Sequence, residues 1–251
     1  MLPLLLAVLL LLPPWATLAL ALLAVAGSVW EYAALSAALG LPLPRVLAVT
    51  GAMAACAAFI APEPPLVVVF SAVVIAGGAV AVSGGQPTRD MLGAVASMAF
   101  AALWIGVPLG TLVAIRYATS AETLMPLIFT VVVSDSAQYY TGRAFGRHPL
   151  SPAISPKKTI EGAIGGMVFA VPAMMWAGSY FLPGVGLAWL ALLGAAIAVL
   201  GMTGDLFESA IKRAAGLKDS SGLIPGHGGL LDRLDAWFFA APVYYVFLRA
   251  W

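Results

Sequence analysis

The sequence predicts an all-α membrane protein, a polytopic bundle of eight or nine transmembrane helices. Two observations lead to this fold class. Hydrophobic residues make up 62% of the 251 residues and charged residues 9%, and the mean hydropathy is +1.02, well beyond what soluble domains show. Apolar stretches of about 20 residues, the length that crosses a bilayer as a helix, also recur along the whole chain.

The first apolar stretch, residues 1–39, contains one charged residue, Glu31, and a Pro-Pro pair at 13–14 that breaks any continuous helix. Two interpretations remain open. Met1–Leu12 and Trp15–Leu39 form two helices of a hairpin, or they form one long broken span. We discount a secretory signal peptide, because the segment has no basic start and runs directly into further spans.

Seven further spans are expected, each near the length that a bilayer requires. They are Arg45–Ala61, Pro64–Val82, Met91–Arg116, Leu124–Gly142, Gly162–Phe181, Leu187–Arg213 and Leu234–Trp251. The single cysteine, Cys56, can form no intramolecular disulfide and is interpreted as a small buried hydrophobic residue.

The charges of the loops predict the orientation of these spans. Loops rich in Arg and Lys alternate with loops near Glu63, residues 116–122 and residues 183–184, and the positive-inside rule places the basic loops in the cytoplasm. The basic residues of the loops placed in the cytoplasm are Arg45, Arg89, Arg143, Arg147, His148, Lys157, Lys158, Lys212, Arg213 and Lys218. We therefore expect an integral protein of the bacterial inner membrane whose active site faces the cytoplasm.

Charge is concentrated in the second half of the chain. Of the 23 Lys, Arg, Asp and Glu residues, 15 lie between Asp135 and Asp235. We interpret residues 1–251 as a single integral membrane domain, with a scaffold-rich part at 1–133 and a site-bearing part at 134–251. The net charge of +1 shows no basic surplus of the kind that a nucleic-acid partner requires.

The densest group of charges lies around residues 205–235. Asp205 and Glu208 are three residues apart, as are Asp232 and Asp235, so each pair lies on one face of a helix. Between the pairs, the glycines of the loop 225–229 allow the backbone to approach a bulky ligand. Since carboxylates bind hard cations, while Lys and Arg bind phosphate, the pattern indicates a metal–phosphate site.

The same segment resembles the signature of the phosphatidate cytidylyltransferase family, the CDP-diacylglycerol synthases. The resemblance extends over every fixed position of that signature. These positions are Ser209, Lys212, Arg213, Lys218, Asp219, Pro225, His227, Gly228, Gly229, Asp232, Arg233 and Asp235.

A second motif places Asp135 about two turns inside the end of a span, where an aspartate is usually functional because its insertion costs about 3 kcal/mol. A plain helix–helix hydrogen bond is the alternative. The run is similar to the family's Asp-x-x-Ala-Tyr-x-x-Gly-Arg/Lys pattern through Asp135, Tyr139 and Arg143, but Gln138 stands where alanine is usual. This departure leaves the packing of the helix open.

A third motif, Ser155-Pro-Lys157-Lys158-Thr159, also resembles the family. Two adjacent lysines at a membrane surface can anchor the chain to anionic lipid. Thr159, however, is placed to cap the next helix, whose free N–H groups attract an anion. We therefore expect this segment to contact a phosphate of the lipid or of the nucleotide.

The family resemblance implies the reaction of CTP with phosphatidate to give CDP-diacylglycerol and pyrophosphate. The carboxylates indicate Mg²⁺ as cofactor, and a second cation and a homodimer are left open. The expected catalytic residues are Lys157, Lys158, Lys212, Arg213, Lys218, His227 and Arg233. The expected substrate-binding residues are Asp135, Tyr139, Arg143, Ser155, Thr159, Ser209, Asp219, Gly228 and Gly229. The expected metal ligands are Asp205, Asp232 and Asp235.

Three alternatives share parts of this pattern. A CTP-dependent lipid kinase and a CDP-archaeol-type synthase would use the same metal and phosphate chemistry. An ion or solute transporter is the non-enzyme alternative, but it predicts charges spread near the middle of the bilayer and an inverted repeat, which we do not find. For His227, ordering the glycine loop, binding phosphate and transferring a proton all remain open.

Overall fold

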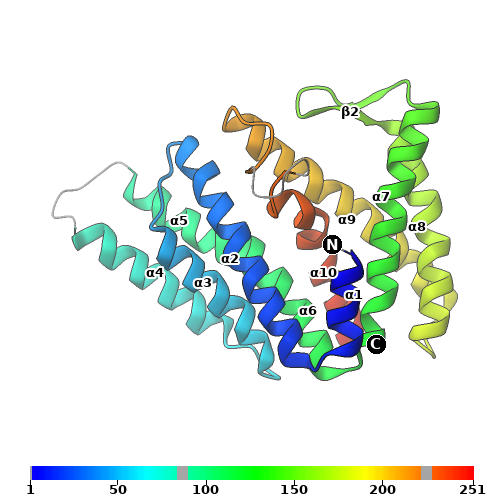
Figure 1. Ribbon diagram of the computed structural model, residues 1–251, viewed down its shortest axis with the longest axis horizontal. Helices are drawn as coiled ribbons and strands as arrows, with labels where there is room; N and C mark the ends of the chain where they lie inside the picture. Colours follow the sequence, from blue (N-terminus) through cyan, green and yellow to red (C-terminus); the bar gives the residue numbers. More distant parts are fainter. Residues whose placement is uncertain (1, 84–89, 222–227) are drawn as a thin grey trace. The chain divides into compact units, whose positions relative to one another are not determined.

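The structure, a computed structural model, describes residues 2–83, 90–221 and 228–251 (Figure 1). In these residues the chain forms ten α-helices joined by three short helical turns and one β-hairpin. The helices are α1 (Leu2–Leu11), α2 (Pro14–Ala38), α3 (Arg45–Ala57), α4 (Leu66–Ser83), α5 (Met91–Ala101), α6 (Val107–Ala118), α7 (Met125–Phe145), α8 (Ile160–Phe181), α9 (Leu187–Ala214) and α10 (Leu231–Ala250).

The prolines at 13 and 14 separate α1 from α2. Pro13 has an extended backbone, and Pro14 is the first residue of α2, a position where the missing N–H of proline costs nothing. Residues 1–39 therefore form two helices, whereas their role as two spans of a hairpin or as one broken span stays a prediction.

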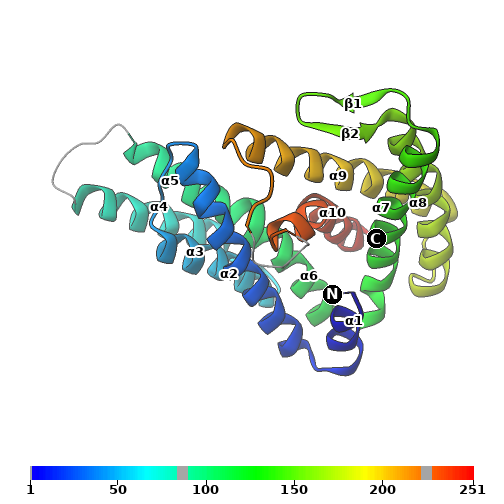
Figure 2. The ribbon, with the colours of Figure 1, turned by 45° about the horizontal axis from the view of Figure 1, so that its top comes forward.

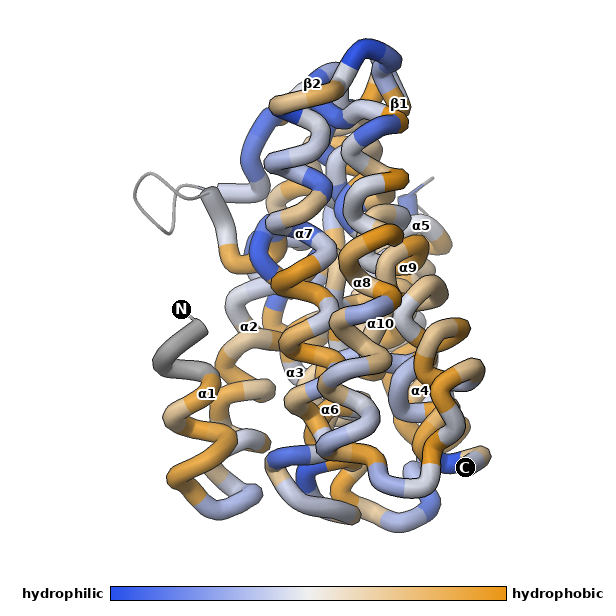
Figure 3. Tube along the Cα trace, turned by 90° about the vertical axis from the view of Figure 1, so that its right-hand side faces the viewer, coloured by the Kyte–Doolittle hydropathy of each residue, from blue (hydrophilic) through white to orange (hydrophobic). Residues whose placement is uncertain are grey.

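Five stretches of helix in the described part of the chain are long and apolar enough to cross a membrane. They are Pro14–Ala38, Leu66–Ser83, Met91–Ala118, Ile160–Phe181 and Leu187–Ala214. Figure 3 shows the hydrophobic character of α4 and the hydrophilic character of the region around the β-hairpin. An all-α membrane protein is confirmed, whereas the count of eight or nine spans stays a prediction.

The chain divides into two compact units, which are described separately below. Unit 1 comprises Met1–Ala118 and Ile211–Leu234, and unit 2 comprises Thr119–Ala210 and Asp235–Trp251. Each unit thus takes residues from both halves of the sequence. The single domain with a scaffold at 1–133 and a site at 134–251 stays a prediction.

In unit 1, a π-helical turn (η2, Ala102–Gly106) joins α5 to α6, so that Met91–Ala118 runs as one helical stretch. Gly106 and Gly110 let this stretch approach α3 closely, because a Cβ atom at either would overlap backbone atoms of Ala52 or Cys56. Cys56 is completely buried at this contact, in agreement with its predicted role as a small hydrophobic residue.

In unit 2, the segment after α7 differs from the loop that the sequence predicted. It forms an antiparallel hairpin of β1 (Pro149–Ser151) and β2 (Ser155–Thr159), labelled in Figure 2. The adjoining Glu161 stabilises this hairpin: its carboxylate accepts hydrogen bonds from the amides of Arg147 and His148, at 3.1 and 3.3 Å, and contacts His148 Nδ1 at 2.6 Å. The lysine pair at 157–158 is therefore held on a strand.

Helix α8 follows β2 without a linker. The hydroxyl of Thr159 accepts a hydrogen bond from the amide of Gly162 at 3.1 Å, so the prediction that Thr159 caps α8 is confirmed.

Helices α7 and α8 lie side by side, and glycines of α8 make room for polar side chains of α7. A Cβ atom at Gly165 would overlap Thr141, and one at Gly166 would overlap Gln138. Gln138 also donates a hydrogen bond to Ser134 Oγ at 3.2 Å. The larger side chain at 138, where the family pattern has alanine, is thus accommodated opposite a glycine.

Candidate active site

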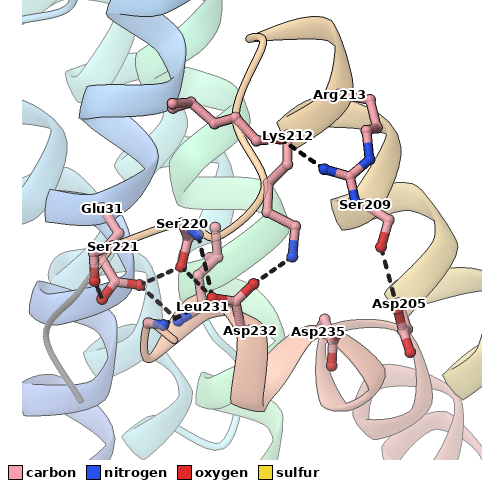
Figure 4. A network of polar contacts seen from close by, with 12 residues as sticks. Glu31, Asp205, Ser209, Lys212, Arg213, Ser220, Ser221, Leu231, Asp232 and Asp235 are labelled. Carbon is pink, nitrogen blue, oxygen red and sulfur yellow. Dashed lines mark hydrogen bonds and ion pairs between the residues drawn. The ribbon is translucent and has the colours of Figure 1, made fainter. Parts of the chain in front are cut away.

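In unit 1, the polar site is built where α9 ends and α10 begins. Lys212, in the last turn of α9, forms an ion pair with Oδ1 of Asp232 in the first turn of α10 (Figure 4). Oδ2 of Asp232 accepts hydrogen bonds from the Ser220 amide at 3.2 Å, from the Ser220 hydroxyl at 2.9 Å and from the Gly229 amide at 2.7 Å. The side chains of Lys212 and Asp232 are only 9% and 12% exposed.

These contacts determine the ionisation of Asp232, which precedes the apolar stretch of α10. Partial burial by itself raises the pKa of this carboxyl group. The hydrogen bonds from Lys212 and Gly229 outweigh that effect and hold the pKa at about 2. Asp232 is therefore a carboxylate at neutral pH.

Steric constraints explain why glycine occupies positions 228 and 229. Gly228 has φ of +77°, a left-handed conformation that favours glycine, and a Cβ atom there would lie 2.7 Å from Asp232 Oδ2. A Cβ atom at Gly229 would overlap the Ser220 hydroxyl and the carboxylate of Glu31. The predicted close approach of the backbone exists, but toward the protein's own carboxylates; a contact of Gly228 and Gly229 with substrate stays a prediction.

Glu31 was not among the predicted site residues. It lies on α2, is 4% exposed, and accepts four hydrogen bonds from the segment that leads into α10. Its isolation in the apolar residues 1–39 was the available signal. Its partners Ser220 and Ser221 stand out less, because serine is common in loops.

In unit 2, a second ion pair joins β2 to α9. Lys158 Nζ lies 2.6 Å from Oδ2 of Asp205, and the Ser209 hydroxyl lies 3.4 Å from Oδ1 of the same carboxylate. The side chains of Lys158 and Asp205 are 21% and 41% exposed, so this pair is more open than the pair of Lys212 and Asp232.

Further carboxylates of unit 2 surround Asp205. Gly204 brings α9 against the backbone of Asp235, because a Cβ atom at Gly204 would overlap the Asp235 carbonyl. Asp135 interacts electrostatically with Asp205 and Lys158, and Asp235 interacts with Asp205, Glu208 and Asp135. Unit 2 therefore contains interacting acidic side chains from α7, α9 and α10, and Lys158 interacts with two of them, Asp135 and Asp205.

The chemistry of these donors fits a hard cation such as Mg²⁺, which prefers carboxylate oxygens and water. Among the described residues, no three Asp, Glu, His or Cys side chains are close enough together to form a metal site by themselves. Mg²⁺ usually takes one or two protein carboxylates together with substrate phosphates, so a smaller donor set is compatible with it. Asp205, Asp232 and Asp235 as metal ligands stay a prediction.

The other predicted residues of unit 2 lie on the hairpin and the end of α7. Arg143 donates a hydrogen bond to the Tyr139 hydroxyl at 3.2 Å, and both side chains are exposed. Ser155 and Lys157 lie on β2, with Lys157 exposed. Their predicted roles in binding phosphate or nucleotide stay predictions.

The remaining predicted residues of unit 1 are exposed: Arg213, Lys218, Asp219 and Arg233. Arg213 donates a hydrogen bond to the Leu217 carbonyl at 2.8 Å and so stabilises the end of α9. His227 and Pro225 lie outside the described residues.

Comparison with known proteins agrees with this arrangement of motifs. The family model described as "Cytidylyltransferase family" matches residues 1–251, the full length of the chain. The protein belongs to the cytidylyltransferase family. The signature residues of unit 1 and the Lys158–Asp205 pair of unit 2 are therefore features of a cytidylyltransferase family member.

Several curated proteins resemble part of the chain. A phosphatidate cytidylyltransferase of Aquifex aeolicus is 44% identical over 135 residues, which cover 52% of this chain and 49% of the relative. An uncharacterized protein of Escherichia coli is 46% identical over 116 residues, covering 46% and 39%. A phosphatidate cytidylyltransferase of Staphylococcus haemolyticus is 41% identical over 138 residues, covering 53% and 52%. The matched part thus spans about half the length of these relatives or less.

Proposed function

We propose that the protein is a phosphatidate cytidylyltransferase, which converts CTP and phosphatidate into CDP-diacylglycerol and pyrophosphate. The observation that carries the proposal is the family match over the whole chain, together with a polar network in which Lys212 and Gly229 of the signature both contact Asp232. The names of the relatives from Aquifex aeolicus and Staphylococcus haemolyticus support the choice of substrates.

The reaction needs little covalent chemistry from the protein. An oxygen of the lipid phosphate attacks the α-phosphorus of CTP, a P–O bond forms, and the bond to the bridging oxygen breaks, so that pyrophosphate leaves. The lipid phosphate carries its attacking oxyanion near neutral pH, so a dedicated general base is unnecessary. The main barrier is the repulsion between two polyanions, which positioned positive charges lower.

Each unit contains residues suited to that task. In unit 2, Lys158 lies on a strand that leads directly into the N-terminal end of α8, where free amides favour a phosphate group. In unit 1, the Lys212 ammonium is held by Asp232 and is poorly exposed, which strengthens its electrostatic effect. Lys157, Arg213, Lys218 and Arg233 are exposed basic residues that suit the binding of phosphate groups.

Mg²⁺ is part of the proposal, with a second cation left open. When bound, it neutralises charge on the phosphates and assists the departure of pyrophosphate. Asp205 and Asp235 in unit 2 and Asp232 in unit 1 are the proposed ligands.

The reaction is tested with purified protein, phosphatidate, Mg²⁺ and each of the four nucleoside triphosphates, with the released products identified. We expect CTP to give CDP-lipid and pyrophosphate in equal amounts. Release of CDP with a doubly phosphorylated lipid would instead identify a lipid kinase. Preference for an isoprenoid ether lipid phosphate in a competition assay would identify a CDP-archaeol-type synthase.

We also propose eight or nine spans in the bacterial inner membrane and an active site on the cytoplasmic side. In a Cys56→Ser background, single cysteines replacing His148 and Lys218 should react with an impermeant thiol reagent only from the cytoplasmic side. A cysteine replacing Gly184 should react from the other side. Labelling of positions 148 and 218 from opposite sides contradicts the proposed topology.

A homodimer, also proposed, is tested by the mass of the detergent-solubilised protein.

A further inference from the structure

Glu31 is an acidic side chain buried in a membrane-protein helix, and the chemistry proposed above makes no use of it. It lies in the last two turns of α2, among residues that are otherwise apolar, and is 4% exposed. A carboxylate in such surroundings is costly unless its hydrogen-bonding capacity is satisfied. Its partners therefore reveal what the residue does.

Four donors satisfy the carboxylate, two on each oxygen. Oε1 accepts from the Ser221 hydroxyl at 2.6 Å and from the Leu230 amide at 2.9 Å. Oε2 accepts from the Leu231 amide at 2.8 Å and shares the single proton of the Ser220 hydroxyl, 3.1 Å away, with Asp232. A carboxylate offers about four lone-pair positions, so these contacts use its capacity fully.

Two of the donors belong to the start of α10. Leu231 is the first residue of this helix, and the amides at a helix start have no partner within the helix. A negative charge at this end is also favoured by the helix dipole. Glu31 thus caps α10 from α2, about 200 residues earlier in the chain.

The Ser220 hydroxyl connects Glu31 to the signature residues. It contacts Glu31 Oε2 at 3.1 Å and Asp232 Oδ2 at 2.9 Å, and Asp232 in turn pairs with Lys212 (Figure 4). The chain of contacts from Glu31 through Ser220 and Asp232 to Lys212 lies entirely within unit 1.

Two glycines allow close packing around this network. A Cβ atom at Gly229 would overlap both Ser220 Oγ and Glu31 Oε2. One turn before Glu31, a Cβ atom at Gly27 would lie 2.8 Å from the Leu230 side chain. Glu31 is therefore held against the segment 228–231 from two sides.

We propose that Glu31 is a positioning residue, which holds Ser220 and the start of α10 so that Asp232 and Lys212 keep their reactive geometry. Its effect on catalysis rests on the proposed function. Positioning matters because a shift of about 1 Å in a catalytic group can lower the rate about 100-fold. The sequence motif alone does not include this residue.

The proposal is tested by replacing Glu31→Gln and Glu31→Asp, with Glu63→Gln as a matched control at an exposed glutamate of the same unit. Glutamine has nearly the same shape, but its NH₂ group would face donors instead of accepting from them. We expect kcat per folded molecule to fall at least 30-fold in Glu31→Gln, while KM for CTP changes less than 3-fold. The kcat of Glu31→Asp, which keeps the charge, should be at least 3-fold higher than that of Glu31→Gln. The kcat of Glu63→Gln should equal that of the wild type.

The route through Ser220 is tested with a double mutant. Ser220→Ala should lower kcat, and adding Glu31→Gln should lower it scarcely further, because both changes interrupt the same connection. Ser221→Ala, whose hydroxyl contacts Glu31 without contacting Asp232, should have a smaller effect than Ser220→Ala. Additive losses from Ser220→Ala and Glu31→Gln would overturn the positioning role.

Amide hydrogen exchange of residues 228–234 provides a readout that needs no activity. Exchange should increase at least tenfold in Glu31→Gln and remain unchanged in Glu63→Gln.

Wild-type kcat per folded molecule in Glu31→Gln overturns the inference and assigns Glu31 a purely structural role. If Glu31→Gln does not fold, kcat and amide exchange are measured in Glu31→Asp and Ser220→Ala instead. A wild-type kcat in both variants overturns the positioning role of Glu31. If the wild type itself forms no CDP-lipid, the proposed function fails. The role of Glu31 is then judged from amide exchange alone, and it is overturned if exchange in Glu31→Gln equals that of the wild type.

Discussion

Two lysine–aspartate pairs among the described residues differ in their surroundings. Lys212 and Asp232 in unit 1 are nearly buried, and Asp232 accepts further hydrogen bonds from Ser220 and Gly229. Lys158 and Asp205 in unit 2 are partly exposed, and Lys158 lies on a two-stranded hairpin. Because the pair in unit 1 is fixed by further contacts, we expect it to contribute more to folding. The pair in unit 2 has a more exposed carboxylate, so we expect its replacement to affect activity more than stability.

The strongest test of this difference is Asp232→Asn. It removes the carboxylate charge opposite the buried Lys212 ammonium, a change that costs about 3–5 kcal/mol for buried pairs. We expect activity to fall about 1,000-fold and the melting temperature in detergent to fall by roughly 10 °C. The double mutant Asp232→Asn with Lys212→Met should regain melting temperature without regaining activity. An unchanged melting temperature in Asp232→Asn would show that the pair does not contribute to folding.

The next test is Asp205→Asn in the open pair. Exposed ion pairs contribute less than about 1 kcal/mol, so the melting temperature should change by no more than about 4 °C. Activity should nevertheless fall about 100-fold, because the carboxylate is a proposed cation ligand. Glu122→Gln, an exposed glutamate of the same unit, serves as control. A large drop in melting temperature, or near-wild-type turnover, would remove the distinction between the two pairs.

The smallest effect is expected from Thr159→Ala, which removes the cap between the hairpin and α8. Loss of a helix cap costs about 1 kcal/mol, or roughly 2–4 °C in melting temperature. If the hairpin must hold Lys158 in place, turnover should also fall about 3- to 10-fold, mainly through a higher KM for CTP. Thr50→Ala, at an exposed threonine whose hydroxyl bonds only within its own helix turn in the described contacts, is the comparison. Unchanged KM would show that Lys158 does not depend on the cap.

Local signals in the sequence were sufficient for part of this picture. The break at 13–14 and the cap at Thr159 each depend on a few neighbouring residues, and each is found in the structure. The hairpin was missed because Ser155–Thr159 contains a proline and two lysines and lacks the apolar alternation of a strand.

The rest depends on contacts between distant residues. Nothing near Glu31 indicates that its partners lie 189 to 200 residues later. The same holds for Gln138, whose tolerance depends on Gly166 of the following helix. Which residues approach one another across the membrane helices is therefore determined by packing that a linear pattern does not contain.

The separation between Glu31 and its partners also has a consequence for the order of biosynthesis. At about 5 to 20 residues per second, a ribosome needs roughly 10 to 40 s to reach Ser220 after it has made Glu31. During that interval Glu31 lacks the donors that satisfy its carboxylate in the folded protein. The contacts that fix the end of α2 to the start of α10 therefore form only after nearly the whole chain has been made.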